Sequence, residues 1–140
     1  MSAETQRREI RLRDPQVVGE LLDRACAEVD DVRHAVMTSR DGLVIAADSG
    51  SRTEGDGEAT IALHGSALAA AAASIGDHFS GLVSQGRLQS TVFEAERGCV
   101  GVFPMSSTLL LIVTSMPSVT PGRFTAAARR VVSTILQPDR

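Results

Sequence analysis

Residues 58–82 constrain the fold more than any other stretch, because they have the pattern of one long helix with no charged side. When successive residues are turned by about 100°, six apolar residues fall on one stripe. We expect this stripe to pack on the core of the protein. Its residues are Ile61, Leu68, Ala72, Ile75, Phe79 and Leu82.

The opposite side of this helix is small and almost uncharged, although a surface helix normally places charge there. A chain of 140 residues can cover one helix face with its own sheet, so we expect the small face to meet another copy of the chain. The alternative is that the alanines are present only because alanine favours helix formation. The predicted dimer interface consists of Ala59, Leu63, Ser66, Ala70, Ala73, Ser74 and Asp77.

The composition fits one domain and excludes several classes of function. Hydrophobic residues make up 43% of the chain, which is enough for a core at this length. The 14 basic residues are all arginine, and 17 acidic residues bring the net charge to −3. This charge gives no general attraction to nucleic acid or anionic lipid. Without lysine, the chain has neither a Schiff-base lysine nor the lysine of a phosphate-binding loop.

The ends of the domain follow from helix-capping patterns. Asp14-Pro15 has the pattern of an N-cap followed by the first helical residue, and Thr120-Pro121 repeats this pattern before the last helix. We therefore expect a domain over residues 14–137. A flexible polar tail, 1–13, precedes it, and a short tail, 138–140, follows it.

Five segments between the helices have strand character. The first two are joined by Asp41-Gly42, which we expect to form a type I′ turn with positive φ at Gly42. A glycine-rich loop, 48–57, leads into the long helix. Three more strands follow within residues 88–115, and their short connections make neighbouring strands antiparallel. The sequence thus predicts an α+β domain with one five-stranded antiparallel sheet and helices on its faces.

No motif in the chain predicts catalysis, a cofactor site or a metal site. Residues 81–88 have the glycine spacing of a phosphate-binding loop, but Arg87-Leu88 replaces the lysine and hydroxyl that bind phosphate and magnesium. His64 and His78 lie roughly 21 Å apart along a helix, too far to share a metal ion. We therefore expect a protein that is not an enzyme.

Cellular location is predicted from what the sequence lacks. Residues 1–13 have no apolar run like that of a signal peptide, and no stretch is suited to a membrane span. Cys26 and Cys99 lie in a predicted helix and a predicted strand, so we expect buried thiols rather than a disulfide. These observations favour a cytoplasmic protein.

Several segments together carry a resemblance to a known family. The hairpin AVMTSRDGLVIAAD, the alanine-rich helix, the strand pair STVFEAERGCVGVFPM and the apolar TLLLIVT are similar to the bacterial form of the Roadblock/dynein light-chain family. The resemblance covers about residues 16–136. It implies a profilin-like layered architecture with strand order 2-1-5-4-3, with helices on both faces of the sheet. It also implies homodimers that pair through the long helix and the third strand.

The resemblance also implies a function. Bacterial family members bind Ras-like small GTPases as homodimers and regulate their nucleotide state or localisation, often beside a sensor-kinase-like protein. They act as non-enzymatic regulators or scaffolds in signalling. The same resemblance gives no catalytic residues and no cofactor.

A partner surface is expected at the two-fold axis of such a dimer. His64, Asp77 and His78 are placed to form its polar rim. Arg52 and Glu54 of the preceding loop are placed to close over a bound protein. The alternative function is a small-molecule sensor module, because a layered α+β domain can hold a ligand between sheet and helix. A nucleic-acid module ranks lower, since the chain lacks a basic stripe and stacking aromatic residues.

Overall fold

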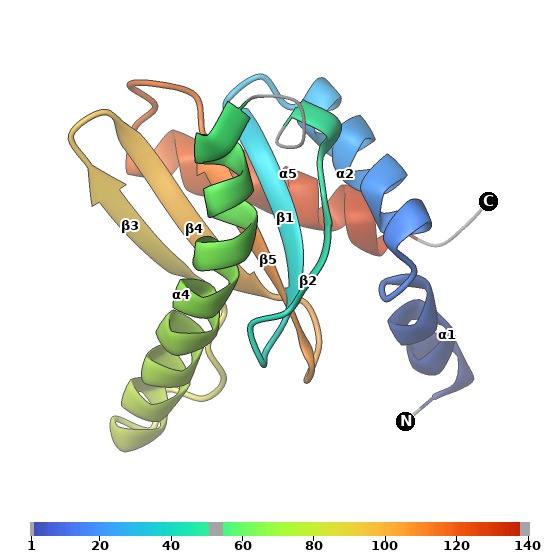
Figure 1. Cartoon of the computed structure of the whole chain (residues 1–140). Helices are drawn as coiled ribbons and strands as arrows, with labels where there is room; N and C mark the ends of the chain where they lie inside the picture. The colour runs from blue at the N-terminus through green and yellow to red at the C-terminus, as the bar shows by residue number, and fades with distance from the viewer. Residues whose placement is uncertain (1, 51–54, 138–140) are drawn as a thin grey trace.

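A five-stranded antiparallel sheet separates one long helix from two shorter helices in the computed structural model (Figure 1). The structure describes residues 2–50 and 55–137, and within the long helix it describes side chains from residue 62 onward. The elements in chain order are α1 (Ala3–Arg11), α2 (Pro15–Glu28), β1 (Val32–Ser39), β2 (Val44–Ala47), α4 (Gly55–Leu82), β3 (Thr91–Ala95), β4 (Gly98–Pro104), β5 (Leu109–Ser115) and α5 (Pro121–Leu136).

The strand order is β2-β1-β5-β4-β3, as predicted, and every neighbouring pair is antiparallel. The central strand β5 contains the continuous apolar run of the sequence, from Leu109 to Val113, and all five of these residues are buried. A strand covered on both faces needs apolar residues at every position rather than at alternate ones. This explains why β5 occupies the centre of the sheet.

Each face of the sheet has its own core. On one face α2 and α5 bury Leu22 and Phe124 against Met37 and Leu111 of the sheet. On the other face α4 covers a smaller core that contains Val36, Val102 and Ile112. Both predicted N-caps are confirmed: Asp14 accepts from the backbone N–H groups of Gln16 and Val17, and Thr120 accepts from that of Arg123.

The segment 1–13, predicted to be a flexible tail, instead contains the helix α1. Ser2 caps this helix, and Leu12 directly after it is buried in the core under α2 and α5. Arg11 donates to the carbonyl oxygens of Ile135 and Gln137, which lie at the end of α5. The prediction was wrong because it relied on the polar composition of the segment, which has four arginines. It did not take into account Leu12, which anchors the segment in the core.

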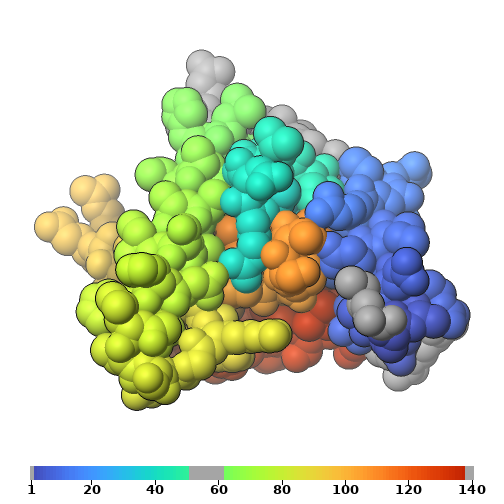
Figure 2. All heavy atoms as spheres, turned by 90° about the horizontal axis from the view of Figure 1, so that it is seen from below, coloured from blue at the N-terminus to red at the C-terminus, as the bar shows by residue number. Residues whose placement is uncertain are grey.

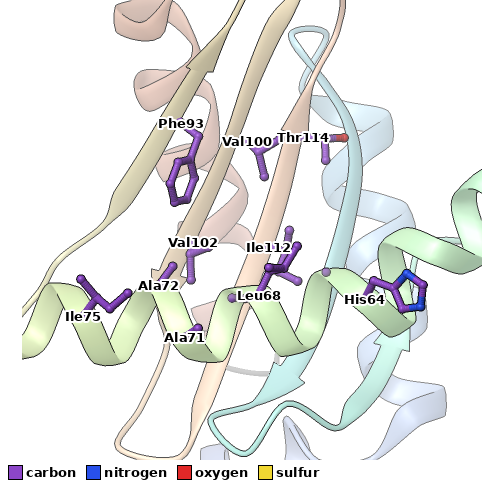
Figure 3. A pocket seen from close by; sticks show the side chains of 12 residues that line it. His64, Leu68, Ala71, Ala72, Ile75, Phe93, Val100, Val102, Ile112 and Thr114 are labelled. Carbon is purple, nitrogen blue, oxygen red and sulfur yellow. The ribbon is translucent and has the colours of Figure 1, made fainter.

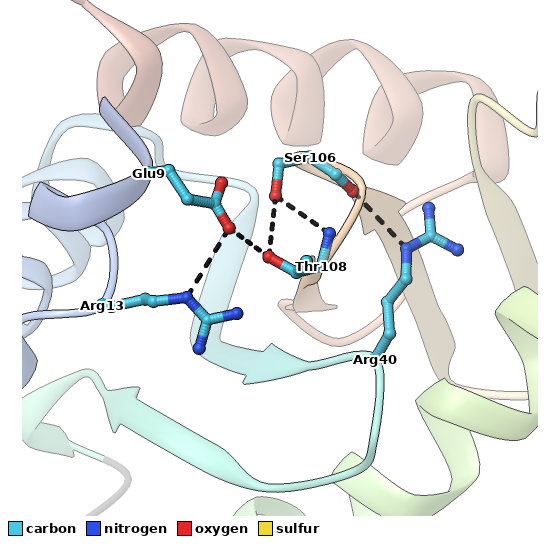
Figure 4. Close-up of polar contacts among 5 residues, drawn as sticks. All are labelled: Glu9, Arg13, Arg40, Ser106 and Thr108. Carbon is cyan, nitrogen blue, oxygen red and sulfur yellow. Dashed lines mark hydrogen bonds and ion pairs between the residues drawn. The ribbon is translucent and has the colours of Figure 1, made fainter. Parts of the chain in front are cut away.

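The last turn of α1 also reaches the turn between β4 and β5 (Figure 4). The Glu9 carboxylate accepts a hydrogen bond from the Thr108 hydroxyl, and the guanidinium of Arg13 lies 3.6 Å from the same carboxylate. Arg40 reaches this turn from the opposite side and donates to the Ser106 carbonyl oxygen at 3.4 Å. Viewed from below, the β1–β2 turn therefore lies between α4 and the β4–β5 turn, with α1 beyond (Figure 2).

The turn between β1 and β2 has one of the two predicted features. Gly42 has φ of 88°, as predicted, but within this turn it is alone in having positive φ. The Gly42 N–H donates to the Ser39 carbonyl oxygen at 3.0 Å, and the Ser39 N–H donates to that of Leu43 at 2.9 Å. This is the pattern of a three-residue loop that ends in a glycine, so the predicted two-residue type I′ turn is wrong.

We predict that Gly42→Ala lowers the free energy of unfolding by about 1 kcal/mol or more, because a side chain at positive φ is strained. An added Cβ would also lie 3.4 Å from Cα of Ala67 in α4. The matched control is Gly19→Ala in α2, where an added Cβ meets nothing within 4 Å and helix propensity favours alanine. Urea denaturation of both variants and of the wild type measures the free energy of unfolding of each. Equal midpoints for Gly42→Ala and the wild type would contradict the turn geometry.

Candidate functional site

The face of α4 that packs on the sheet is the one with small side chains. Ser66, Ala69 and Ala73 are buried there, and the two alanines belong to the core that contains Ile112. The Ser66 hydroxyl donates to the Ala62 carbonyl oxygen at 2.6 Å, so its burial leaves no hydrogen bond unmade. The sequence-based prediction that Ser66 and Ala73 meet another chain is therefore wrong, since the chain's own sheet covers them.

The large apolar residues of α4 are exposed on the outer side of the helix. Leu68, Ile75, Phe79 and Leu82 have exposed fractions of 70%, 67%, 64% and 72%. We call these four residues the outer face of α4. They were predicted to pack on the core, and the structure reverses this assignment. Helical periodicity shows that two faces are opposite, but it does not show which of them fits a sheet already filled by bulky side chains.

A hollow of about 610 Å³ lies beside the outer face, between α4 and the strands β3 and β4. Leu68, Ala72 and Ile75 line it from the helix, and Phe93 and Val100 line it from the strands (Figure 3). His64 and Thr114 are the only polar side chains among its described lining residues. Phe93 and Val100 are themselves exposed, so apolar surface continues from the helix onto the edge of the sheet.

The C-terminal half of α4 extends past the strands (Figure 1) and contacts the β1–β2 turn and the segment that precedes β3. Asp77 forms an ion pair with Arg40 of the β1–β2 turn, with 2.8 Å between Oδ2 and Nη1. Gly76 lies against Leu88, so closely that a Cβ at this position would come within 2.8 Å of the leucine side chain. Asp77, predicted to lie in a dimer interface, is thus paired within its own chain.

The remaining predicted residues divide into three groups. Leu63, Ser74, His64 and His78 are exposed, with the two histidines at either side of Leu68 and Ile75, while Ala70 is half-buried. Arg52 and Glu54 lie outside the described residues, and so does the side chain of Ala59. Sequence reasoning placed Leu68, Ile75 and Phe79 inside the fold, and it did not single out Phe93 or Val100. The sequence shows the seven-residue spacing of Leu68 and Ile75 and the four-residue spacing of Ile75 and Phe79. It does not show that these side chains are exposed.

Another polar pair that the sequence did not predict lies at the opposite end of the hairpin. His34 and Asp48 are both buried, with 3.0 Å between Nδ1 and Oδ2. Asp48 Oδ1 also accepts from the Ala35 N–H at 3.0 Å. Each oxygen of this carboxylate thus binds β1, which fixes the end of β2 on its neighbour. These contacts give the pair a structural role.

Within residues 2–50 and 55–137, no group of three or more histidine, cysteine or acidic side chains is arranged to hold a metal ion. In the same part of the chain, no helix combines the length and apolar character needed to cross a membrane. Burial raises the pKa of the Cys26 thiol to about 12, and the carboxylates of Asp48 and Asp23 add to this effect. Burial also raises the pKa of Cys99. Neither thiol is therefore a good nucleophile near neutral pH.

The sequence and the fold both resemble known proteins. Residues 18–115 match the family model of the Roadblock/LC7 domain. A Roadblock/LC7 domain from Streptomyces avermitilis is 22% identical with a TM-score of 0.65, and the alignment covers 84% of this chain and 92% of that chain. The gliding protein MglB from Thermus thermophilus is 20% identical with a TM-score of 0.63, over 96% of this chain and 90% of that chain.

The likeness extends to profilin. Profilin from Schizosaccharomyces pombe is 14% identical with a TM-score of 0.55, over 84% of this chain and 95% of that chain. No curated protein matches the sequence. At these identities the solved structures show the fold, and they confirm the predicted profilin-like layered architecture.

We predict that neither native cysteine reacts with a thiol reagent at pH 8 in the folded protein, because a thiol with a raised pKa stays protonated there. Both should react after unfolding in guanidinium chloride. Ellman's reagent gives the number of reactive thiols in each state. Cys99 is buried as expected, while Cys26 is half-buried, and one thiol that reacts within minutes in the native protein would contradict their protection.

We predict that Ile75→Asp abolishes self-association without unfolding the chain, because Ile75 is exposed in the single chain and a charge would oppose its burial between chains. The matched control is Ile10→Asp in α1, since Ile10 has the same exposed fraction of 67% on a different element. Light scattering after size exclusion measures the mass, and circular dichroism measures folding. The expectation fails if both variants have the same mass as the wild type.

Proposed function

This chain belongs to the Roadblock/LC7 family, and from this membership we propose that it is a homodimeric regulator or scaffold that binds a Ras-like small GTPase. The resemblance found in the sequence implies this class of partner for bacterial members of the family. The proposal includes a cytoplasmic location and a signalling role beside a sensor-kinase-like protein. Binding would modulate the nucleotide state or the localisation of the GTPase.

The exposed outer face of α4 is the observation that carries the proposal. Four large apolar side chains on one helix face, continued by Phe93 and Val100, form a surface that a monomeric protein rarely leaves in water. The apolar character of this surface supports association with another protein.

The polar residues beside this face are suited to recognition of a second, different protein. His64 borders the hollow, and His78 borders a shallower depression together with Ser74, Phe79 and Leu82. Both imidazoles are exposed and offer hydrogen bonds at the rim of an apolar contact. We propose His64 and His78 as partner-binding residues, and we keep Arg52 and Glu54 as proposed members of the same surface.

If α4 changes the rate of GTP hydrolysis, the catalytic residues must come from the GTPase itself. This helix contains no arginine along its 28 residues, so it has no arginine finger to offer. Its contact could instead hold catalytic residues of the GTPase in place. A scaffold that binds without changing the hydrolysis rate fits the same surface.

A second candidate function is a sensor of an apolar small molecule, and the hollow beside α4 favours it. Its volume of about 610 Å³ lies in the range of small-molecule sites, and its lining is almost entirely apolar. A ligand there would be a hydrocarbon-rich molecule such as a fatty acid. A dose-dependent rise in melting temperature with a medium-chain fatty acid would support the sensor over the adaptor.

We predict that the dimer binds the Ras-like GTPase encoded nearest to its own gene, in at least one nucleotide state. Calorimetric titration with the GDP-bound and GTP-analogue forms measures this, and a hydrolysis assay then separates an activator from a scaffold. The double substitution His64→Glu and His78→Glu should weaken binding at least about tenfold, because acidic side chains cannot donate the hydrogen bonds of the rim.

The control for this experiment is Arg130→Glu, an exposed position on α5 across the sheet from α4, which should leave binding unchanged. Light scattering on each variant shows whether the dimer persists, so that a lost dimer is not mistaken for a lost partner contact. Absence of binding in both nucleotide states would refute the proposed function while leaving the fold and the dimer untouched.

A further inference from the structure

A second, polar pocket of about 260 Å³ lies at the end of the sheet where β1 begins and β5 ends, beside the turn between β3 and β4. Antiparallel pairing brings these parts of the chain together (Figure 1). Arg33 lines the pocket from β1, and Arg97 lines it from the turn. Among the described residues that line it, none is acidic. The pocket is therefore positively charged, although the whole chain has a net charge of −3.

A bulge in β1 directs Arg33 toward this pocket. The register of β1 against β5 shifts between Val32 and His34, so Arg33 is an additional residue in β1. Neighbouring residues of a regular strand point to opposite faces of the sheet, yet Arg33 and His34 both line the pocket. A bulge changes the direction of a side chain in this way, and bulges are frequent beside functional sites.

The backbone at Arg97 is fixed by contacts behind the pocket. The Arg97 carbonyl oxygen accepts a hydrogen bond from the Ser118 N–H at 2.9 Å, which joins the turn to the segment before α5. Gly98 lies so close to Ser115 that a Cβ at this position would come within 2.8 Å of the serine Oγ. The Arg97 side chain is exposed, but it starts from an ordered backbone. A ligand that binds it therefore does not have to order the turn as well.

The rest of the lining supplies a hydroxyl group and an apolar wall. Thr114 Oγ1 accepts a hydrogen bond from the His34 N–H at 3.2 Å, which leaves the hydroxyl hydrogen as a donor. Ala95 and Val100 line the pocket with apolar side chains. The His34 imidazole also lines it, with 3.0 Å between its Nδ1 and Oδ2 of Asp48. Both oxygens of this carboxylate contact β1, so its negative charge is directed at the strand.

This set of groups is suited to an anion that carries a hydrocarbon part. A guanidinium group binds two oxygens of a carboxylate or of a phosphate at once, and a hydroxyl donor adds a third hydrogen bond. Carboxylate and phosphate share this chemistry at Arg33 and Arg97. The apolar wall separates them, because inorganic phosphate would leave Ala95 and Val100 without a favourable contact. A volume of about 260 Å³ has room for an acid of a few carbon atoms.

We infer that this pocket binds a small organic carboxylate, with its anionic group at Arg33 and Arg97. The hydrocarbon part of the ligand contacts Ala95 and Val100. The pocket adjoins the hollow beside α4, since Val100 and Thr114 line both, but only the polar pocket contains arginine. The inference goes beyond the proposed function and depends on neither the homodimer nor the GTPase.

A titration followed by the NMR signals of the backbone amides tests this inference. Butanoate, added at constant ionic strength, should shift the amide signals of Arg33, Arg97 and Gly98 until they saturate. Butyramide has nearly the same shape without the charge, so at equal concentrations it should leave these signals in place. Arg97→Gln should weaken butanoate binding about tenfold or more, because it removes one charge-assisted contact. The matched control is Arg129→Gln, at an exposed position of α5, which should bind butanoate as the wild type does.

Three results would overturn the inference. The first is the absence of a saturable shift with butanoate, and the second is an equal shift with butyramide. The third is unchanged butanoate binding in both Arg97→Gln and Arg33→Gln, whose amide spectra also show whether each variant is folded. Inorganic phosphate is the remaining probe, and tighter binding of phosphate than of butanoate would refute the assignment to an organic acid. A negative GTPase titration beside saturable butanoate binding would refute only the proposed function.

Discussion

The contact between the small face of α4 and the sheet determines most of what is distinctive in this protein. Ser66, Ala69 and Ala73 can lie directly on a sheet surface that Val36, Val102 and Ile112 already fill, because they add little volume of their own. A helix packed through its small residues must turn its large ones outward. The exposed apolar face and the hollow beside it are therefore consequences of how the core is filled.

The layout of the sheet was predictable because each strand carries its own local pattern. The uninterrupted apolar run of β5 required cover on both faces, and Gly42 required a turn, so central strand and hairpin followed from sequence alone. The end-to-end strand order came from the family resemblance rather than from these patterns. The detailed turn type was missed, since Asp41-Gly42 fits both a two-residue loop and the observed three-residue loop.

The candidate site was predictable only in part, because it depends on which side of α4 faces inward. A stripe of leucine, isoleucine and phenylalanine ordinarily identifies the buried side of a helix, yet here Leu68 and Ile75 are exposed in the single chain. A stripe of apolar side chains indicates that a helix face is covered by protein. The sequence alone does not show whether the same chain or a different chain covers it. The pairs Arg40–Asp77 and His34–Asp48 were missed for a simpler reason, since each joins elements whose relative placement only the fold supplies.

The proposed homodimer places a second copy of the chain over the outer face of α4. Sedimentation equilibrium of the wild-type protein from low to high micromolar concentration tests it most directly, because it needs neither a substitution nor a partner. We predict a mass twice that of the chain over most of this range. A mass equal to that of a single chain at high micromolar concentration would contradict it.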